Sequence, residues 1–208
     1  ATGANARWRE VAVAGHCGDD ATARAALVDA DPVVRELALG ALNRLHLLDD
    51  LVVTAALADP DPRVRRRAAT LAANRPGIPL LNALSDDDST VVETAAWACG
   101  EQQPEGPGID DAILHRLIEL AGGATDALIR EAAVAALGAI GDERALPAII
   151  VACQDKPAVR RRAILALSPF DDPTVDAALR IALTDRDWQV RQAAEDVTRA
   201  IDGGRSAD

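Results

Sequence analysis

The chain has 208 residues, 49% of them apolar, and a mean hydropathy of +0.02, which is typical of one soluble globular domain. It contains no run of eighteen apolar residues and no charged-then-apolar leader, so neither a membrane span nor a signal peptide is indicated. A formal net charge of −11 disfavours a general binder of nucleic acid or of anionic membranes.

The three cysteines, Cys17, Cys99 and Cys153, are far apart and form no CxxC pair. Neither a disulfide framework nor a thiolate zinc site is therefore expected, and a reducing, cytoplasmic location is favoured. Aromatic residues make up only 2% of the chain, whereas alanine occurs throughout. This composition favours closely packed helices over a β-sheet, which prefers β-branched and aromatic residues.

The first quarter of the chain alternates two kinds of helical segment. Residues 1–5 are predicted to be a flexible N-terminus, followed by a helix at 6–15 around WREVAVAG. A shorter helix is expected in ATARAALVDA, and then Asp31-Pro32 places a capping carboxylate and a proline at the start of a longer helix. The apolar residues of that helix fall on one stripe of a 3.6-residue period: Val34, Ala38, Ala41 and Leu42.

The second quarter repeats this order. DLVVTAALAD predicts a short helix, and Asp61-Pro62 starts the helix of VRRRAATLA. GIPLLNALSD predicts the next short helix, and Ser89 is expected to cap the helix that contains VETAAWACG. The polar stretch GEQQPEGPG at 100–108 then interrupts the pattern, either as a surface loop or as an insertion at a binding edge.

The second half continues the alternation to the end of the chain. The predicted helices lie in DAILHRLIELA, IREAAVAALG, ERALPAIIVAC, VRRRAILAL, TVDAALRIALTD and VRQAAEDV. The last helix is expected at 187–201, and residues 202–208 are predicted to be a flexible C-terminal tail.

One phrase therefore recurs with a period near thirty residues, which indicates a repeat architecture. Each unit reads as a short helix A, a turn, and a longer helix B that carries a marker residue after an apolar one. The third residue after every marker is an alanine, and a small side chain on the buried stripe lets helices pack closely. The markers are Arg9, Arg35, Arg65, Glu93, Arg130, Arg160 and Arg191.

The phrases DADPVVRELALGAL and GDERALPAI resemble HEAT repeats, specifically the short HEAT-like kind of the phycobilisome lyases. The resemblance covers residues 6–201 as one repeat domain. It implies an all-α fold, a right-handed α-α superhelix (solenoid) of about six and a half helical hairpins. Because the chain lacks methionine and starts on a helix B without its helix A, we expect it to be part of a longer solenoid or multidomain chain.

The resemblance also implies a ladder between units, formed by an aspartate in the inter-helix turn and the arginine of helix B. Three pairs keep a six-residue spacing: Asp29/Arg35, Asp59/Arg65 and Asp185/Arg191. Glu93 interrupts the series, and Ala124 and Gln154 stand six residues before Arg130 and Arg160. The ladder is therefore predicted to be incomplete in the middle units.

No residue pattern predicts catalysis. The three histidines have no second ligand at metal spacing, and no phosphate-binding loop, GxSxG motif or paired-carboxylate motif is present. The iron chemistry of deoxyhypusine hydroxylase, an enzyme built from HEAT repeats, is not supported. We expect a non-enzyme without cofactor or metal.

The candidate binding residues lie on the B helices. Most markers are followed, four residues later, by an apolar side chain, and the candidates among these are Leu39, Trp97, Val134 and Ile164. These side chains either pack against the neighbouring unit or form the floor of an apolar groove centred on Trp97. Arg66 and Arg161, next to two markers, would then meet acidic residues of a partner.

The favoured function is a non-catalytic scaffold or adaptor that binds a protein or peptide on its concave B-helix face. One alternative is nucleic-acid binding, as in the HEAT-like alkylpurine DNA glycosylases. The arginines at 62–75 and 157–168 are separated by neutral-to-acidic helices, however, whereas a duplex requires a continuous basic stripe. The resemblance to phycobilisome lyases suggests a third possibility, carriage of a tetrapyrrole.

Overall fold

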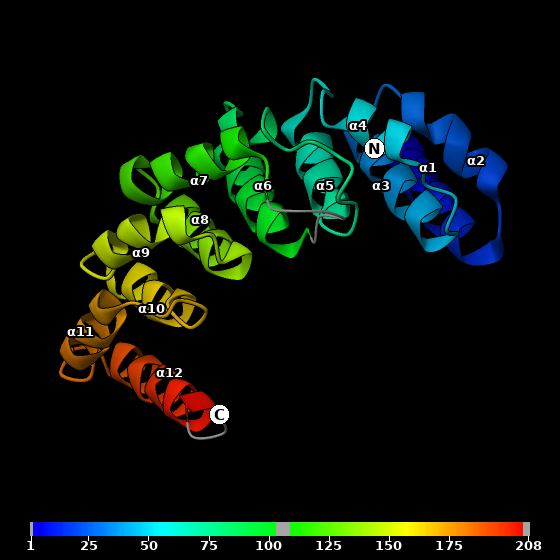
Figure 1. The fold of residues 1–208 in the computed structure, drawn as a ribbon. Coiled ribbons are helices and arrows are strands. Elements are labelled where there is room, and N and C mark those ends of the chain that lie inside the picture. Colours follow the sequence, from blue (N-terminus) through cyan, green and yellow to red (C-terminus); the bar gives the residue numbers. More distant parts are fainter. Residues whose placement is uncertain (1, 103–108, 206–208) are drawn as a thin grey trace. The chain divides into compact units, whose positions relative to one another are not determined.

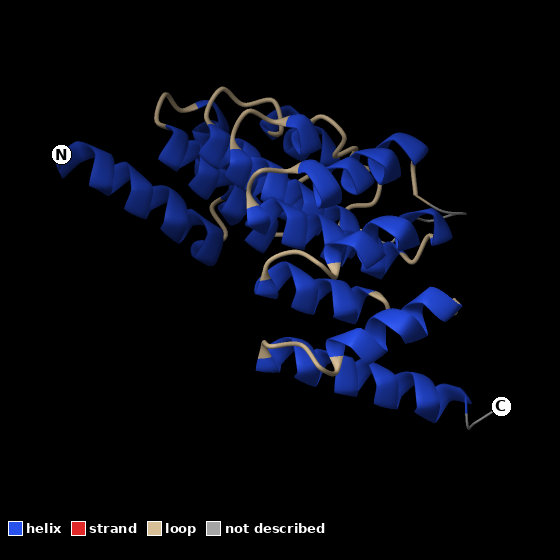
Figure 2. Ribbon diagram, turned by 90° about the vertical axis from the view of Figure 1, so that its left-hand side faces the viewer, coloured by secondary structure: helices blue, strands red, loops and turns tan. Residues whose placement is uncertain are grey.

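The computed structural model describes residues 2–102 and 109–205 (Figure 1). This part of the chain contains twelve α-helices and three short 3₁₀ helices and has no strand (Figure 2). The predicted all-α fold is confirmed. The contacts group the chain into two compact units, residues 1–95 and residues 96–208, and the division falls within α6 (Ser89–Glu101). Most of the interrupting stretch 100–108 lies outside the described residues.

Unit 1 consists of two helix layers. The B helices are α1 (Thr2–Cys17), α3 (Pro32–Arg44) and α5 (Pro62–Ala72), of which α1 packs on α3 and α3 on α5. The A helices α2 (Asp20–Ala25) and α4 (Asp50–Ala56) cover α3 and α5 (Figure 1). Each A helix therefore lies beside the B helix that follows it in sequence.

Unit 2 repeats the two layers. Its A helices are α7 (Asp111–Gly123), α9 (Leu146–Ala152) and α11 (Pro173–Ala182), which contact one another in series. Its B helices α8 (Ala127–Ile140), α10 (Pro157–Ala166) and α12 (Trp188–Arg205) do the same. In Figure 1 the A helices lie along one side of the unit and the B helices along the other. The right-handed sense of the superhelix stays a prediction.

The B helices begin where their capping residues predict. The carboxylates of Asp31, Asp61 and Asp126 each accept the N–H of the residue two positions later, at 2.9–3.0 Å. These bonds satisfy donors that a helix leaves free at its first turn. Proline at the next position costs nothing in α3 and α5, because that N–H would be unpaired anyway.

Small residues set the distance between B helices. The alanines three residues after five of the six marker arginines are fully buried: Ala38, Ala68, Ala133, Ala163 and Ala194. The closest approach involves glycine, since a Cβ added to Gly138 of α8 would lie 2.5 Å from the Cβ of Ala166 in α10. The predicted close helix packing is confirmed, and glycine as well as alanine makes it possible.

The helix bounds differ from the prediction in three places. The first helix starts at Thr2 rather than at residue 6, and the last extends to Arg205 rather than 201. Neither flank contains a proline, which would end the helix. The segment GIPLLNALSD contains only the 3₁₀ helix η2 (Ala83–Ser85). Pro79 lacks an N–H, and too few residues follow it before the next turn for an α-helix to become established. Ile78, Leu80 and Leu84 are nevertheless buried, so the segment still fills the place of an A helix.

Candidate interaction surfaces

A guanidinium–carboxylate pair links successive hairpins. In unit 1, Arg35 of α3 donates from Nε and Nη2 to the two carboxylate oxygens of Asp59, at 2.8 and 2.6 Å. Its Nη1 donates to the backbone carbonyl of Asp29, at 2.8 Å. The Asp59 carboxylate also accepts the backbone N–H of Asp61, at 2.9 Å. One arginine therefore fixes the turn before its own helix to the turn of the next hairpin.

The same bidentate geometry recurs three times, which makes four pairs that we call the ladder. The distances from arginine Nε and Nη2 to the carboxylate oxygens are 2.6–2.9 Å in Arg65–Asp86, Arg130–Asp155 and Arg160–Asp185. Hydrogen bonds from the arginines hold the pKa of Asp86, Asp155 and Asp185 below the ordinary aspartate value. The side chains are mostly buried, so each charge is compensated by its partner rather than by water.

The predicted partners within this ladder were wrong. Asp29/Arg35, Asp59/Arg65 and Asp185/Arg191 are not side-chain pairs, because each arginine reaches only the backbone carbonyl of the aspartate six residues before it. The carboxylates bind the arginine of the preceding hairpin instead. Arg130 and Arg160, which were expected to lack partners, are ladder members. Asp155 lies five rather than six residues before Arg160, so a fixed spacing missed it.

The helix register of α6 also differs from the prediction. Asp88, not Ser89, caps this helix, since its carboxylate accepts the N–H of Thr90 at 2.9 Å. Counting from this cap, Val92 rather than Glu93 occupies the position of the ladder arginine, and Ala124 occupies that of the following aspartate. The signal was present in the sequence as Asp-X-Asp at 29–31, 59–61, 86–88 and 185–187.

This register moves Trp97 away from the other predicted groove residues. Leu39, Val134 and Ile164 are buried, which contradicts a groove floor on the exposed side of the B helices. Their position, eight residues after the cap, lies on the same stripe as the core residues. Trp97 lies nine residues after its cap and is 41% exposed. The corresponding positions elsewhere hold Gly40, Thr70, Ala135 and Leu165.

We call five exposed or half-buried residues of α6, α8 and α10 the outward stripe: Trp97, Glu131, Ala135, Arg161 and Leu165. A Cβ on Gly100 would lie 2.8 Å from the Cα of Ala136, which places α6 directly beside α8. Arg161 is exposed, and its guanidinium makes no hydrogen bond or ion pair with residues that the structure describes. In unit 1 the predicted site residue Arg66 is likewise exposed on α5.

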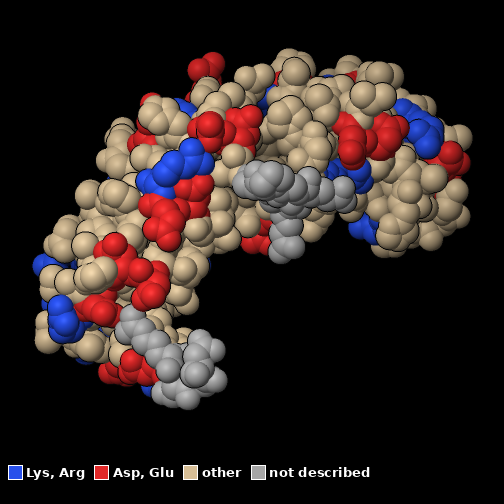
Figure 3. Space-filling model, in the orientation of Figure 1, with Lys and Arg blue, Asp and Glu red and all other residues tan. Residues whose placement is uncertain are grey.

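The basic side chains do not form a continuous stripe. Arg162 of α10 lies 3.7 Å from Glu131 of α8, so part of the positive charge of α10 is compensated across the helix interface. On the face seen in Figure 3, the basic side chains of the described residues are separate spots with acidic side chains beside them. A strand or duplex that neutralises successive phosphates would find acidic groups between these spots.

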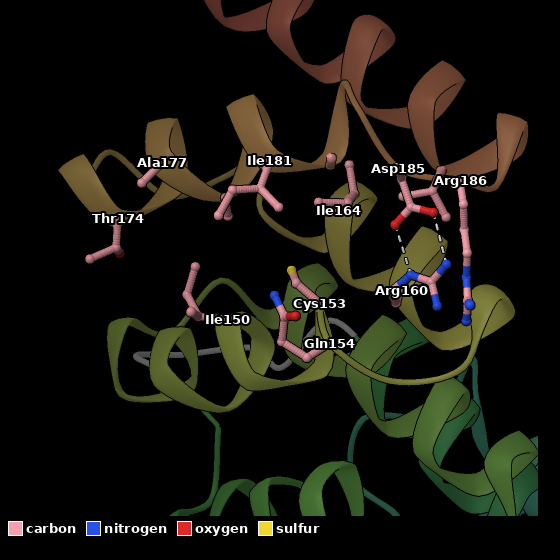
Figure 4. Close-up of a pocket in the computed structure, with 13 residues that line it drawn as sticks. Ile150, Cys153, Gln154, Arg160, Ile164, Thr174, Ala177, Ile181, Asp185 and Arg186 are labelled. Atoms are coloured by element: carbon pink, nitrogen blue, oxygen red, sulfur yellow. Dashed lines mark hydrogen bonds and ion pairs between the residues drawn. The ribbon is translucent and has the colours of Figure 1, made fainter.

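A groove runs between α9 and α11 in unit 2 (Figure 4). It has a volume of about 610 Å³, and buried Ile164 of α10 contributes to its lining. Ile150 projects from the α9 side and Ala177 and Ile181 from the α11 side, while the Arg160–Asp185 pair lies at one end (Figure 4). Ile164 therefore faces the A-helix side of the unit rather than the outward stripe. No spacing in the sequence indicated this groove.

The described residues show no constellation for catalysis or metal binding. Burial raises the pKa of Cys99 to about 12 and that of Cys153 to about 11, so neither thiol ionises at neutral pH. No group of three or more His, Cys, Asp or Glu side chains suited to a metal ion occurs in residues 2–102 and 109–205. Within the same residues, no helix is long and apolar enough to cross a bilayer.

The repeated hairpins and the ladder define a class, the all-α repeat proteins of the solenoid type. The sequence profile of the family described as HEAT repeats matches residues 78–158 and 114–198, which together span more than half of the chain. The chain belongs to this family. No match to it was found among curated proteins.

Solved structures share the fold. An engineered protein is 20% identical, with a TM-score of 0.65 over 88% of this chain and 98% of its own. A second engineered protein is also 20% identical, with a TM-score of 0.63 over 89% and 97% of the two chains. The Escherichia coli protein YibA is 20% identical, with a TM-score of 0.64 over 90% of this chain and 71% of its own. These likenesses concern the fold alone.

Proposed function

We propose that the protein is a non-catalytic, cytoplasmic scaffold that binds a protein or peptide on the B-helix side of unit 2. The observation that carries this proposal is the position of Trp97. A large aromatic ring stands, 41% exposed, at a position that is otherwise small, polar or aliphatic. A tryptophan with this exposure still has apolar surface to bury against a partner. Tryptophan is also enriched among residues that dominate binding energy.

The charges of the outward stripe favour an acidic partner. Glu131 lies near Arg162, so Arg161 is the stripe cation without an ion pair to any described residue. Adjacent helix axes are about 8–10 Å apart, which puts Trp97 and Arg161 about 20 Å from each other across α8. An extended peptide of about six residues covers that distance. We therefore expect an apolar side chain at Trp97 and a carboxylate at Arg161.

The experiment is selection of twelve-residue peptides by display on the full chain, followed by fluorescence polarisation. We expect the selected peptides to combine an aliphatic or aromatic residue with Asp or Glu about six residues away. Trp97→Ala and Arg161→Glu should each raise the Kd at least tenfold without loss of helical content. Trp188→Ala, which removes a more exposed tryptophan at the start of α12, is the control and should leave the Kd unchanged.

Two outcomes contradict the proposal. Selected peptides that bind Trp97→Ala as tightly as the unmodified chain would show that Trp97 is only a packing residue. A mobility shift with duplex DNA that weakens steeply with salt, in the absence of peptide binding, would favour the nucleic-acid alternative.

A further inference from the structure

The groove between α9 and α11 lies on the A-helix side of unit 2, away from the outward stripe. Its walls are helical and mainly apolar, with Ile150 on one side and Ala177, Ala178 and Ile181 on the other. Ile181 is 63% exposed, and Val151, the neighbour of Ile150 in α9, is 66% exposed. A large aliphatic side chain of the groove wall, Ile181, therefore stays largely in water.

This groove is larger than its counterpart in unit 1. The equivalent groove, lined by residues of the 3₁₀ helix η1 (Ala26–Val28), of α3, α4 and α5, and by Asp59, has a volume of about 220 Å³. Both contain a ladder pair and the side chain eight residues after a B-helix cap, Leu39 in unit 1 and Ile164 in unit 2. Alanines at 177, 178 and 182 leave α11 without side chains that would fill the space.

One end of the groove carries an exposed cation, Arg186, which also acts electrostatically on Asp185. Both carboxylate oxygens of Asp185 are taken by Arg160, at 2.8 and 2.9 Å, and one of them also accepts the N–H of Asp187. Arg186 lines the groove beside this pair (Figure 4) and is exposed. Its side chain has no hydrogen bond or ion pair to the described residues. The groove therefore combines an apolar body with a positive end.

We propose that this groove is a second binding site, which takes an amphipathic helix of a partner protein with an acidic residue that meets Arg186. The walls are α-helices whose backbone groups are already paired, so an extended strand finds no hydrogen-bonding edge there. The exposure of Ile181 favours a helix over an enclosed small ligand, because a helix also covers this side chain. Aliphatic residues at i, i+3, i+4 and i+7 of that helix would enter the groove, and the alanines of α11 permit a close approach.

The test uses a display library of fifteen-residue alanine-rich helices, randomised at positions 4, 7, 8, 11 and 15 and selected on the full chain. We expect aliphatic residues at the first four positions and Asp or Glu at the fifth. Arg186→Gln should weaken binding severalfold and reduce its dependence on salt. Arg180→Gln, which removes an exposed arginine of α11 outside the groove lining, is the matched control and should have no effect.

Two variants should block binding in the groove. Ala178→Trp should fill it and lower the affinity at least tenfold. Ile181→Glu changes an exposed position that tolerates charge, so it keeps the test valid if the first variant fails to fold. Trp97→Ala should leave helix binding unchanged. A failure of the groove proposal can then be distinguished from a failure of the proposed peptide site at Trp97.

Three results would overturn the proposal. They are failure of any library helix to enrich above a scrambled library, equal binding to Ile181→Glu, and an Arg186→Gln variant with unaltered affinity. If no helix binds but dodecanoate does, the occupant is an aliphatic carboxylate. This result would equally reject the partner helix.

Discussion

Helices α5 and α10 contain almost the same phrase, VRRRAATLA and VRRRAILAL, in two different units. In both, the first arginine joins the ladder and the second points into solvent. The ladder partner of Arg65 lies 21 residues further along, beyond a segment without an α-helix, whereas that of Arg160 lies 25 residues further, beyond α11. The role of an arginine is therefore set by its position after the cap, and the ladder tolerates different lengths of chain between its members.

Removal of adjacent arginines one at a time tests whether their position or their charge sets their roles. Arg160→Ala leaves the mostly buried Asp185 without its partner and should lower the free energy of unfolding by about 2–4 kcal/mol. Arg161→Ala removes an exposed side chain of the same helix and should change it by less than about 0.5 kcal/mol. Chemical denaturation of both variants measures the difference. Equal losses would mean that the phrase acts through its charge alone.

Acid should reduce the difference in stability between the unmodified chain and Arg160→Ala. Hydrogen bonds from Arg160 hold the pKa of Asp185 below its ordinary value of 3.8. The stability that this pair adds is thus fully present above that value and is lost as the pH falls through the lower, folded-state pKa. Thermal melts of the two proteins should therefore converge below about pH 4, whereas those of Arg161→Ala and the unmodified chain should differ little at any pH. A constant gap down to pH 2 would contradict the charged ladder.

The sequence was most informative about local structure and least about contacts between hairpins. Asp31-Pro32 and Asp61-Pro62 predicted helix starts correctly, because a cap acts on donors only two residues away. The partner of Arg35 could not be found by a six-residue spacing, since it belongs to the next hairpin. A search for Asp-X-Asp turns would have found Asp86 and corrected the register of α6. The groove beside α11 depends on the absence of side-chain volume at three alanines, which no motif records.

A smaller loss of stability is expected when the packing between α8 and α10 is disturbed. Gly138→Ala would force the new Cβ to within 2.5 Å of the Cβ of Ala166, so α8 and α10 must separate. We expect a loss of about 1–3 kcal/mol in the free energy of unfolding. Gly122→Ala in α7 is the matched control, because nothing lies within 4 Å of its added Cβ. It should raise stability by up to about 1 kcal/mol through helix propensity. A neutral Gly138→Ala would show that the B helices are not closely packed.

The smallest expected change in stability concerns the residues that follow two B helices. α8 ends at Gly141 with φ of 68°, whereas α3 is followed by His46 with φ of 59°, a conformation that glycine adopts without strain. The Leu47 N–H still donates to the Leu42 carbonyl at 2.9 Å, so the turn itself is intact. His46→Gly should therefore raise stability by about 0.5–1 kcal/mol, and Gly141→Ala should lower it by a similar amount. Because a Cβ at Gly141 would meet only ordinary contacts, at 3.7 Å or more, the two changes isolate backbone conformation from packing. Shifts of the same sign in both variants would show that side-chain contacts, and not the positive φ, decide these helix ends.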